Sequence, residues 1–133
     1  MSDRPVHAVV DTNVLVSALW NKNGSPARVV EMILRGELSP CVSFEIMREY
    51  REVLFREKFG FMKKDVNDLL ACIEAKSRIV TAVSSVVPFI DESDRKFYDI
   101  AKICNVVLIT GNVKHYPDEP FIETVNGFLA KNG

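Results

Sequence analysis

Apolar residues along the chain follow two spacings that alternate from one segment to the next. Short continuous apolar runs, rich in β-branched residues, occupy 6–10, 38–42 and 106–110, and such runs are typical of strands buried in a parallel sheet. A further strand is predicted within 79–87, where the pattern does not define its ends, and an edge strand near 121–123. The pattern therefore predicts four to five strands.

Between these runs, apolar residues recur at the i, i+3, i+4 spacing of amphipathic helices. Ser25 and Pro26 suit the cap and first position of one helix, which Gly36 ends, and Ser43 suits the cap of the next. The predicted helices span 13–21, the segment between Ser25 and Gly36, the segment from Ser43 to a break at 59–61, 63–77, 94–104, and a short stretch through 128–129.

Strands that alternate with helices predict a parallel sheet with right-handed crossovers and helices on both faces. The chain has 133 residues, 47% of them hydrophobic, which is enough to bury a core without a partner or a disulfide. We therefore expect a single domain over 1–133 of the α/β class. Its architecture is predicted to be a three-layer α/β/α sandwich around a mainly parallel sheet of four to five strands.

Charge and cysteine content narrow the functional classes. The chain carries 17 basic and 18 acidic residues, so no overall field attracts it to nucleic acid or to a membrane. Cys41, Cys72 and Cys104 are odd in number and lie in apolar patterns, which favours reduced thiols over disulfides or a zinc site. No apolar run approaches the roughly 18 residues of a membrane span, and the N-terminus lacks a signal-peptide core. We expect a cytoplasmic protein without membrane association.

Acidic and amide side chains follow the carboxyl ends of the predicted strands. Asp11 ends the first strand, and Asn112 follows the fourth. Glu49 lies on the helix after the second strand, and Asp94 opens the helix after the third. Each residue alone would also suit an ordinary helix cap, turn or surface position. Together they are expected to converge, because the carboxyl ends of parallel strands share one edge. Neighbouring carboxylates repel each other, and Mg²⁺ or Mn²⁺ with hard oxygen ligands removes that repulsion.

Four segments in this order resemble the successive motifs of the PIN domain family, and more closely the VapC-like toxins of bacterial toxin–antitoxin pairs. The segments are 9–17 (VVDTNVLVS), Ser43 with 49–54 (EYREVL), 94–98 (DRKFY) with Ala101, and 108–112 (LITGN). The resemblance implies a PIN-like fold and a ribonuclease that hydrolyses single-stranded RNA. It also implies that Asp11, Glu49 and Asp94 bind one or two Mg²⁺ or Mn²⁺ ions, that an antitoxin protein is a partner, and that the chain forms a homodimer.

One position departs from the family pattern. Many PIN nucleases have an acid where this chain has Asn112, which supplies an amide oxygen but no negative charge. This loss is expected to weaken metal binding, so the alternative is a PIN module that binds RNA or an antitoxin without efficient cleavage. Asp99 is a poor substitute, because five helical residues rotate it by roughly 140° from Asp94. The other acids that would have to reach the site to substitute are Asp91, Glu92 and Asp118.

Polar neighbours of the acids are predicted to support the site. Thr12 and Asn13 would orient Asp11, and Thr110 would position a water or a phosphate, although all three also suit helix caps or a strand end. The candidate RNA-binding residues are basic: Arg48, Arg51, Lys114 and His115.

The segment 48–64 combines basic and aromatic residues. Six basic residues interleave with Phe55, Phe59 and Phe61, a mixture that single-stranded nucleic acid uses for phosphate contacts and base stacking. The same residues would also form a solvated helix face, or a surface for the helix of a partner protein.

Overall fold

The computed structural model describes residues 4–82, 84–89 and 91–133. Within them, strands form one sheet in the order β3-β2-β1-β4-β5, and every neighbouring pair is parallel. The strands are β1 (Val6–Val10), β2 (Leu38–Val42), β3 (Arg78–Ile79), β4 (Val107–Thr110) and β5 (Ile122–Thr124). The predicted α/β class is confirmed, and the sheet is wholly parallel.

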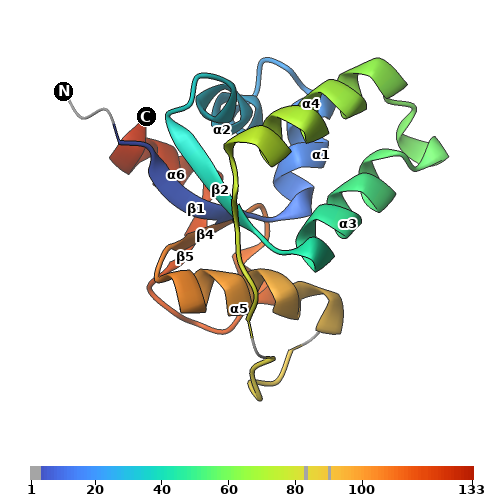
Figure 1. Cartoon of the computed structure of the whole chain (residues 1–133). Helices are drawn as coiled ribbons and strands as arrows, with labels where there is room; N and C mark the ends of the chain where they lie inside the picture. The colour runs from blue at the N-terminus through green and yellow to red at the C-terminus, as the bar shows by residue number, and fades with distance from the viewer. Residues whose placement is uncertain (1–3, 83, 90) are drawn as a thin grey trace.

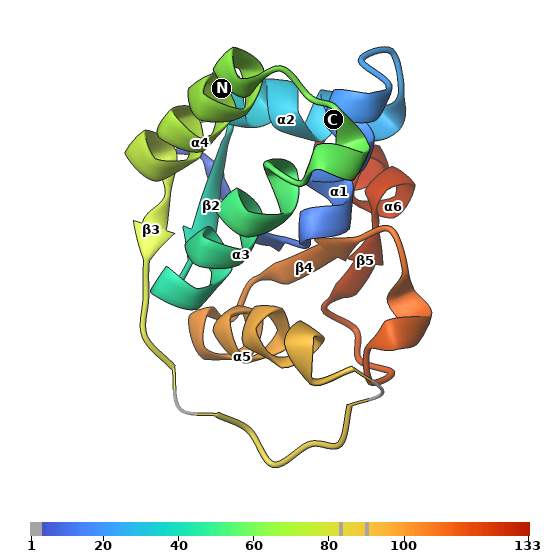
Figure 2. The same ribbon diagram turned by 90° about the vertical axis from the view of Figure 1, so that its right-hand side faces the viewer.

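Helices cover both faces of this sheet. The helix α5 (Arg95–Cys104) packs against β1, β2 and β4 on one face, whereas α1 (Thr12–Trp20) and α2 (Ser25–Leu34) lie on the other (Figures 1 and 2). The remaining helices are α3 (Phe44–Leu54), α4 (Lys63–Lys76), α6 (Val125–Asn132) and the short 3₁₀ turns η1 (Glu57–Phe59), η2 (Glu92–Asp94) and η3 (Val113–His115). The three predicted layers are therefore present.

Burial of the central strand β1 on both faces of the sheet explains its continuous apolar sequence. Val9 and Val10 point to opposite faces of the sheet, and both are almost completely buried because helices cover both faces. Leu108 and Ile109 on the neighbouring β4 are buried in the same way. The largest fully buried side chains around these strands are Tyr50, Phe97, Tyr98 and Phe128.

The pairing of β1 with β4 fixes the edge at which the candidate acids lie. Val10 is level with Ile109, and the Asp11 backbone N–H donates to the Ile109 carbonyl at 2.9 Å, one residue beyond the end of β1. Asp11 therefore leaves the sheet at its carboxyl edge, next to Thr110, the last residue of β4.

The predicted strand within 79–87 is mostly wrong. Only Arg78 and Ile79 pair with β2, and the Val80 N–H adds one hydrogen bond to the Val42 carbonyl at 2.7 Å. Val42 is the last residue of β2, so the chain beyond this point has no neighbouring strand to extend the ladder. The described residues of 80–89 instead run around the outside of the molecule toward α5 (Figure 2), and residue 83 of the prediction lies outside the described residues.

Two predicted helix starts also need correction. Gly24 occupies the cap position of α2, and Ser25 is its first helical residue, followed by Pro26. Asp94 does not open α5 directly, because it ends the turn η2 and the helix begins at Arg95. No helix in the described part of the chain is long and apolar enough to cross a membrane.

Candidate functional site

Asp11 is a buried carboxylate held by several hydrogen-bond donors. Its side chain is at the N-cap of α1, where it accepts from the Asn13 backbone N–H at 3.4 Å. Its Oδ2 accepts from the Thr110 hydroxyl at 2.9 Å and from the Tyr116 hydroxyl at 2.7 Å. Burial raises the pKa of Asp11, and the hydrogen bonds from Tyr116 and Thr110 oppose that rise. Capping alone does not account for this residue, since two side chains orient it as well.

Thr110 and Asn13 connect Asp11 to the turn after β4. The Thr110 hydroxyl, which donates to Asp11, also accepts from the Asn112 backbone N–H at 3.0 Å. The Asn13 side-chain oxygen accepts from the Gly111 N–H at 3.0 Å. These bonds fix the start of α1 against the end of β4. The Asn13 backbone and the Thr110 hydroxyl contact Asp11 directly, whereas the Thr12 hydroxyl, which was also expected to orient Asp11, donates to Glu49 instead.

Glu49 reaches the same edge from α3. Its Oε2 accepts a short hydrogen bond from the Thr12 hydroxyl, and its Oε1 lies 2.7 Å from Lys96 Nζ on α5. The side chains of Lys96 and Glu49 are only 17% and 20% exposed, so this ion pair is partly shielded from solvent. Glu49 is therefore held between α1 and α5.

Asp94 carries the least satisfied carboxylate of the site. It precedes α5 in the cap position, yet its side chain makes no capping hydrogen bond. Its Oδ2 is buried without a hydrogen-bond partner among the described residues, and the His115 ring lies nearby, with Nδ1 at 3.8 Å. Burial, followed by the charges of Asp11 and Asp91, raises the pKa of Asp94 to about 6. The charge of Glu49 adds to this rise, which places all three candidate acids within electrostatic range of one another.

The donor set of these acids fits a divalent cation, although the side chains are not arranged as a closed metal site. Within residues 4–82, 84–89 and 91–133, no group of three or more His, Cys, Asp and Glu side chains has the arrangement to hold a metal ion. Asp11 and Asp94 nevertheless repel each other, and Asp94 Oδ2 accepts no hydrogen bond from the described residues. Hard carboxylate oxygens of this kind suit Mg²⁺ or Mn²⁺.

Of the basic residues predicted to bind RNA, some lie at the acidic site and others on more distant surfaces. His115 lies beside Asp94, and its Nε2 is 2.9 Å from the Asn112 side-chain nitrogen. Arg48 lines a cleft of about 400 Å³ together with Glu49 and Lys96. Arg51 and Lys114 are exposed, and no contact of theirs with the acids is observed within the described residues.

The aromatic residues of 48–64 lie away from the acids. Phe59 and Phe61 stack at 5.4 Å, and both contact the edge or face of Trp20. Trp20 is the last residue of α1, whereas Asp11 caps its first turn, so the length of the helix separates this aromatic cluster from the site. The cluster, defined as Trp20, Phe59 and Phe61, is exposed chiefly at Trp20, which is 62% accessible.

Of the possible substitute acids, only Asp91 is close to the site. Its charge contributes to the raised pKa of Asp94, and its side chain caps η2 through Ser93. Glu92 pairs with Arg95, and no contact of Asp118 with the site is observed among the described residues. Asp99 points elsewhere, toward Ser85, as its helical position led us to expect.

The sequence did not predict two residues that contact the candidate acids. Tyr116 binds Asp11 from 105 positions away, and Lys96 binds Glu49 from another helix. No local signal distinguishes either one, because a tyrosine after a strand and a lysine on an amphipathic helix are both ordinary. Only the position of Lys96 two residues after Asp94, within the segment 94–98, could have drawn attention to it.

Together, the wholly parallel sheet and the buried carboxylates at its carboxyl edge define an α/β domain with an acidic site. The chain belongs to the PIN domain family, because the model of that family, described as PIN domain, matches residues 7–114. This confirms the family resemblance of the sequence motifs.

Two further similarities agree with this family. The chain is 28% identical over 110 residues to uncharacterized protein MJ1680 of Methanocaldococcus jannaschii, covering 80% of this chain and 71% of that protein. The fold is similar to a chain of the crystal structure of VapBC2 from Rickettsia felis bound to a DNA fragment from their promoter. The TM-score is 0.53 at 17% identity, over 82% of this chain and 90% of that chain, so the likeness is one of fold.

Proposed function

We propose that this PIN domain is a metal-dependent ribonuclease that hydrolyses single-stranded RNA and acts as the toxin of a toxin–antitoxin pair. The observation that carries the proposal is Asp94: a buried carboxylate oxygen without a hydrogen bond, beside the charges of Asp11 and Glu49. A fold needs no such arrangement for stability, since mutual repulsion makes it unfavourable. Binding of a cation would make it favourable.

Asp11 and Asp94 would hold the Mg²⁺ or Mn²⁺, with Glu49 as a further ligand or as proton acceptor. When bound, such an ion would supply a water of lowered pKa and neutralise charge on the phosphate. Thr110 and Tyr116 keep Asp11 in one orientation through their hydrogen bonds to Oδ2. In-line attack would leave a 5′-phosphate and a 3′-hydroxyl.

Glu49 and its partners serve the proton transfer in this proposal. The Thr12 hydroxyl and the Lys96 ammonium fix the Glu49 carboxylate from two sides. Glu49 would accept the proton of the attacking water, and Lys96 and His115 would face the phosphate. The exposed Arg48 beside this cleft would contact a neighbouring phosphate of the strand.

A second candidate function is an RNA-binding or antitoxin-binding PIN module with weakened catalysis. Two observations favour it: Asn112 supplies no charge, and Lys96 already compensates Glu49. In either case we propose an antitoxin protein as partner, supported by the fold likeness to a VapBC2 chain, with the exposed aromatic cluster as a candidate surface for its helix. A homodimer remains a prediction.

The deciding experiment is cleavage of a mixed-sequence single-stranded RNA by the purified protein with Mn²⁺, Mg²⁺ or EDTA. Asp11→Asn and Asp94→Asn are compared with Asp68→Asn, an exposed carboxylate on α4 that pairs only with Lys64 in the observed contacts. We expect metal-dependent cleavage that is lost in the first two variants and retained in the third. Cleavage by Asp11→Asn at the wild-type rate would refute the nuclease site, and inert wild type that still binds RNA would establish the binding module.

A further inference from the structure

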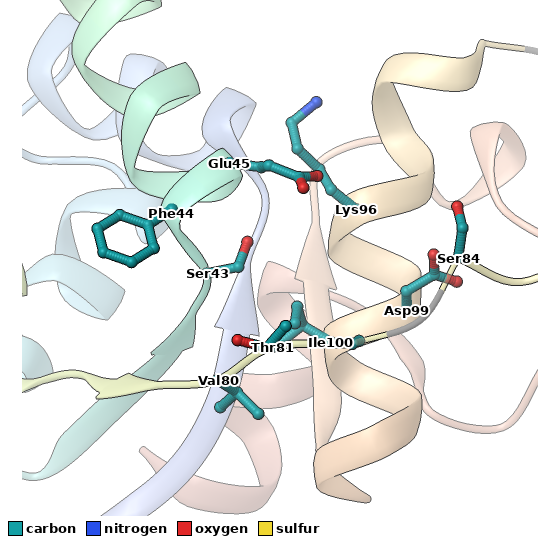
Figure 3. A pocket seen from close by; sticks show the side chains of 10 residues that line it. Ser43, Phe44, Glu45, Val80, Thr81, Ser84, Lys96, Asp99 and Ile100 are labelled. Carbon is teal, nitrogen blue, oxygen red and sulfur yellow. The ribbon is translucent and has the colours of Figure 1, made fainter.

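A pocket of about 190 Å³ lies next to the acidic site, between the start of α3, residues 80–82 and 84, and α5 (Figure 3). Apolar side chains of Val80 and Ile100 form part of its wall. Its polar lining residues include Ser43, Glu45, Lys96 and Asp99. The sequence analysis assigned no function to this region.

Asp99 gives the pocket an unusual hydrogen-bond acceptor. Its residue surface is only 9% exposed, and its Oδ2 accepts from the Ser85 backbone N–H at 3.2 Å. The other oxygen, Oδ1, is buried and accepts no hydrogen bond from the described residues. In Figure 3 the Asp99 side chain points from α5 toward the segment that carries Ser84. A buried carboxylate oxygen in a pocket is expected to have a donor, and a bound ligand can supply it.

The basic residues near the pocket are already engaged by other groups. Asp99 interacts with Arg95, whose guanidinium donates to the Ser85 carbonyl at 2.7 Å and to its hydroxyl at 2.8 Å. Figure 3 shows Glu45 extending from α3 toward the stem of Lys96. Arg95 also pairs with Glu92, and Lys96 pairs with Glu49, so both bases are engaged elsewhere and Asp99 Oδ1 has no hydrogen-bond donor among the described residues.

The pocket is continuous with the proposed catalytic residues. Glu45 and Lys96 line both this pocket and the cleft that contains Glu49, and the Lys96 ammonium contacts Glu49 at 2.7 Å. Phe44, at the rim, is 84% exposed, and its ring points away from Asp99 in Figure 3. An exposed aromatic ring beside a polar pocket is the combination on which unstacked RNA bases are bound.

We propose that this pocket receives one nucleobase of the RNA and selects a base with an exocyclic amino group, which donates to Asp99 Oδ1. The inference rests on the proposed function, because it places the reading pocket beside the acids that would cleave the strand. Cytosine offers an amino group at the position where uracil offers a carbonyl oxygen, so a carboxylate accepts from the first and repels the second. Lys96 lines both the pocket that would hold the base and the cleft that would hold the phosphate.

The test measures RNA binding in EDTA, where no cleavage occurs, by fluorescence anisotropy of the full chain. The probes are an oligouridine and the same oligomer with cytidines in place of its central uridines. Wild type is expected to bind the cytidine-containing oligomer about tenfold more tightly, the effect of one hydrogen bond to a charged group. In Asp99→Asn the amide oxygen still accepts from Ser85 while the amide nitrogen replaces Oδ1, so the preference should disappear or turn toward uridine.

Asp68→Asn is the matched control and should keep the wild-type preference, and circular dichroism checks that each variant is folded. Equal affinity of wild type for the two oligomers overturns the proposal without any variant. Binding of an arginine-rich peptide that depends on Asp99, with no base preference, also overturns it in favour of a protein ligand.

The outcomes separate this inference from the nuclease itself. Metal-dependent cleavage without a base preference would support the proposed nuclease and refute the base-binding role of the pocket. A base preference that depends on Asp99, in a protein that does not cleave RNA, would support the base-binding role of the pocket and refute the nuclease activity.

Discussion

Replacing Asp94 by Asn is predicted to stabilise the metal-free protein at neutral pH while removing its response to metal. The reason is the environment of this carboxylate, whose pKa burial and the neighbouring charges of Asp11 and Asp91 raise to about 6. A raised pKa means that the folded protein favours the protonated form. Ionisation of Asp94 therefore lowers the free energy of unfolding as pH rises from about 4 to about 6, and the loss is complete above that range.

The magnitude follows from the pKa difference. An ordinary value of 3.8 against about 6 corresponds to about 3 kcal/mol of unfavourable free energy. Solvent screening at a partly accessible site reduces this figure, so we expect Asp94→Asn to gain about 1–2 kcal/mol near pH 7.5. Near pH 4 the wild-type carboxyl is protonated in the folded state and about half ionised in the unfolded state, so most of the gain should vanish.

The assay is urea unfolding of both proteins in EDTA at these two pH values, repeated with Mn²⁺ at neutral pH. Mn²⁺ should stabilise wild type by mass action and leave Asp94→Asn unchanged. Asp118→Asn, at an exposed aspartate, serves as control and should show neither effect. A variant that is less stable than wild type in EDTA at pH 7.5 would refute the reasoning, because Asp94 would then be a structural residue.

The other predictions concern the contacts around the acids. Tyr116→Phe removes a donor from Asp11 and should weaken Mn²⁺ binding about tenfold in calorimetry, and an unchanged affinity would show that Tyr116 does not orient the ligand. Lys96→Gln breaks the partly shielded ion pair with Glu49 and should cost about 1 kcal/mol in urea unfolding, together with most RNA cleavage. Full cleavage by this variant would contradict the role proposed for Lys96. Asn112→Asp restores a charge beside the site and should raise Mn²⁺ affinity several-fold in the same calorimetric titration. Equal affinities would contradict the premise that Asn112 weakens the site.

Local patterns determined most of the fold. The continuous apolar run of β1 predicts burial on both faces, and the order of strands and helices predicts the parallel sheet. Since parallel strands share their carboxyl edge, the same reasoning placed Asp11, Asn112 and the helix of Glu49 at one edge before any contact was known. Family membership also follows from sequence, because its motifs are short and local.

Only tertiary structure decided which groups these acids contact and where the sheet ends. The strand predicted within 79–87 stops at Ile79 because β2 ends at Val42, and strand length depends on a neighbour that is distant in sequence. Tyr116 and Lys96 reach Asp11 and Glu49 across the fold, and the buried oxygens of Asp94 and Asp99 depend on what packs around them. Hydropathy spacing is a property of one segment, whereas hydrogen bonding and desolvation at a site arise from several segments packed together.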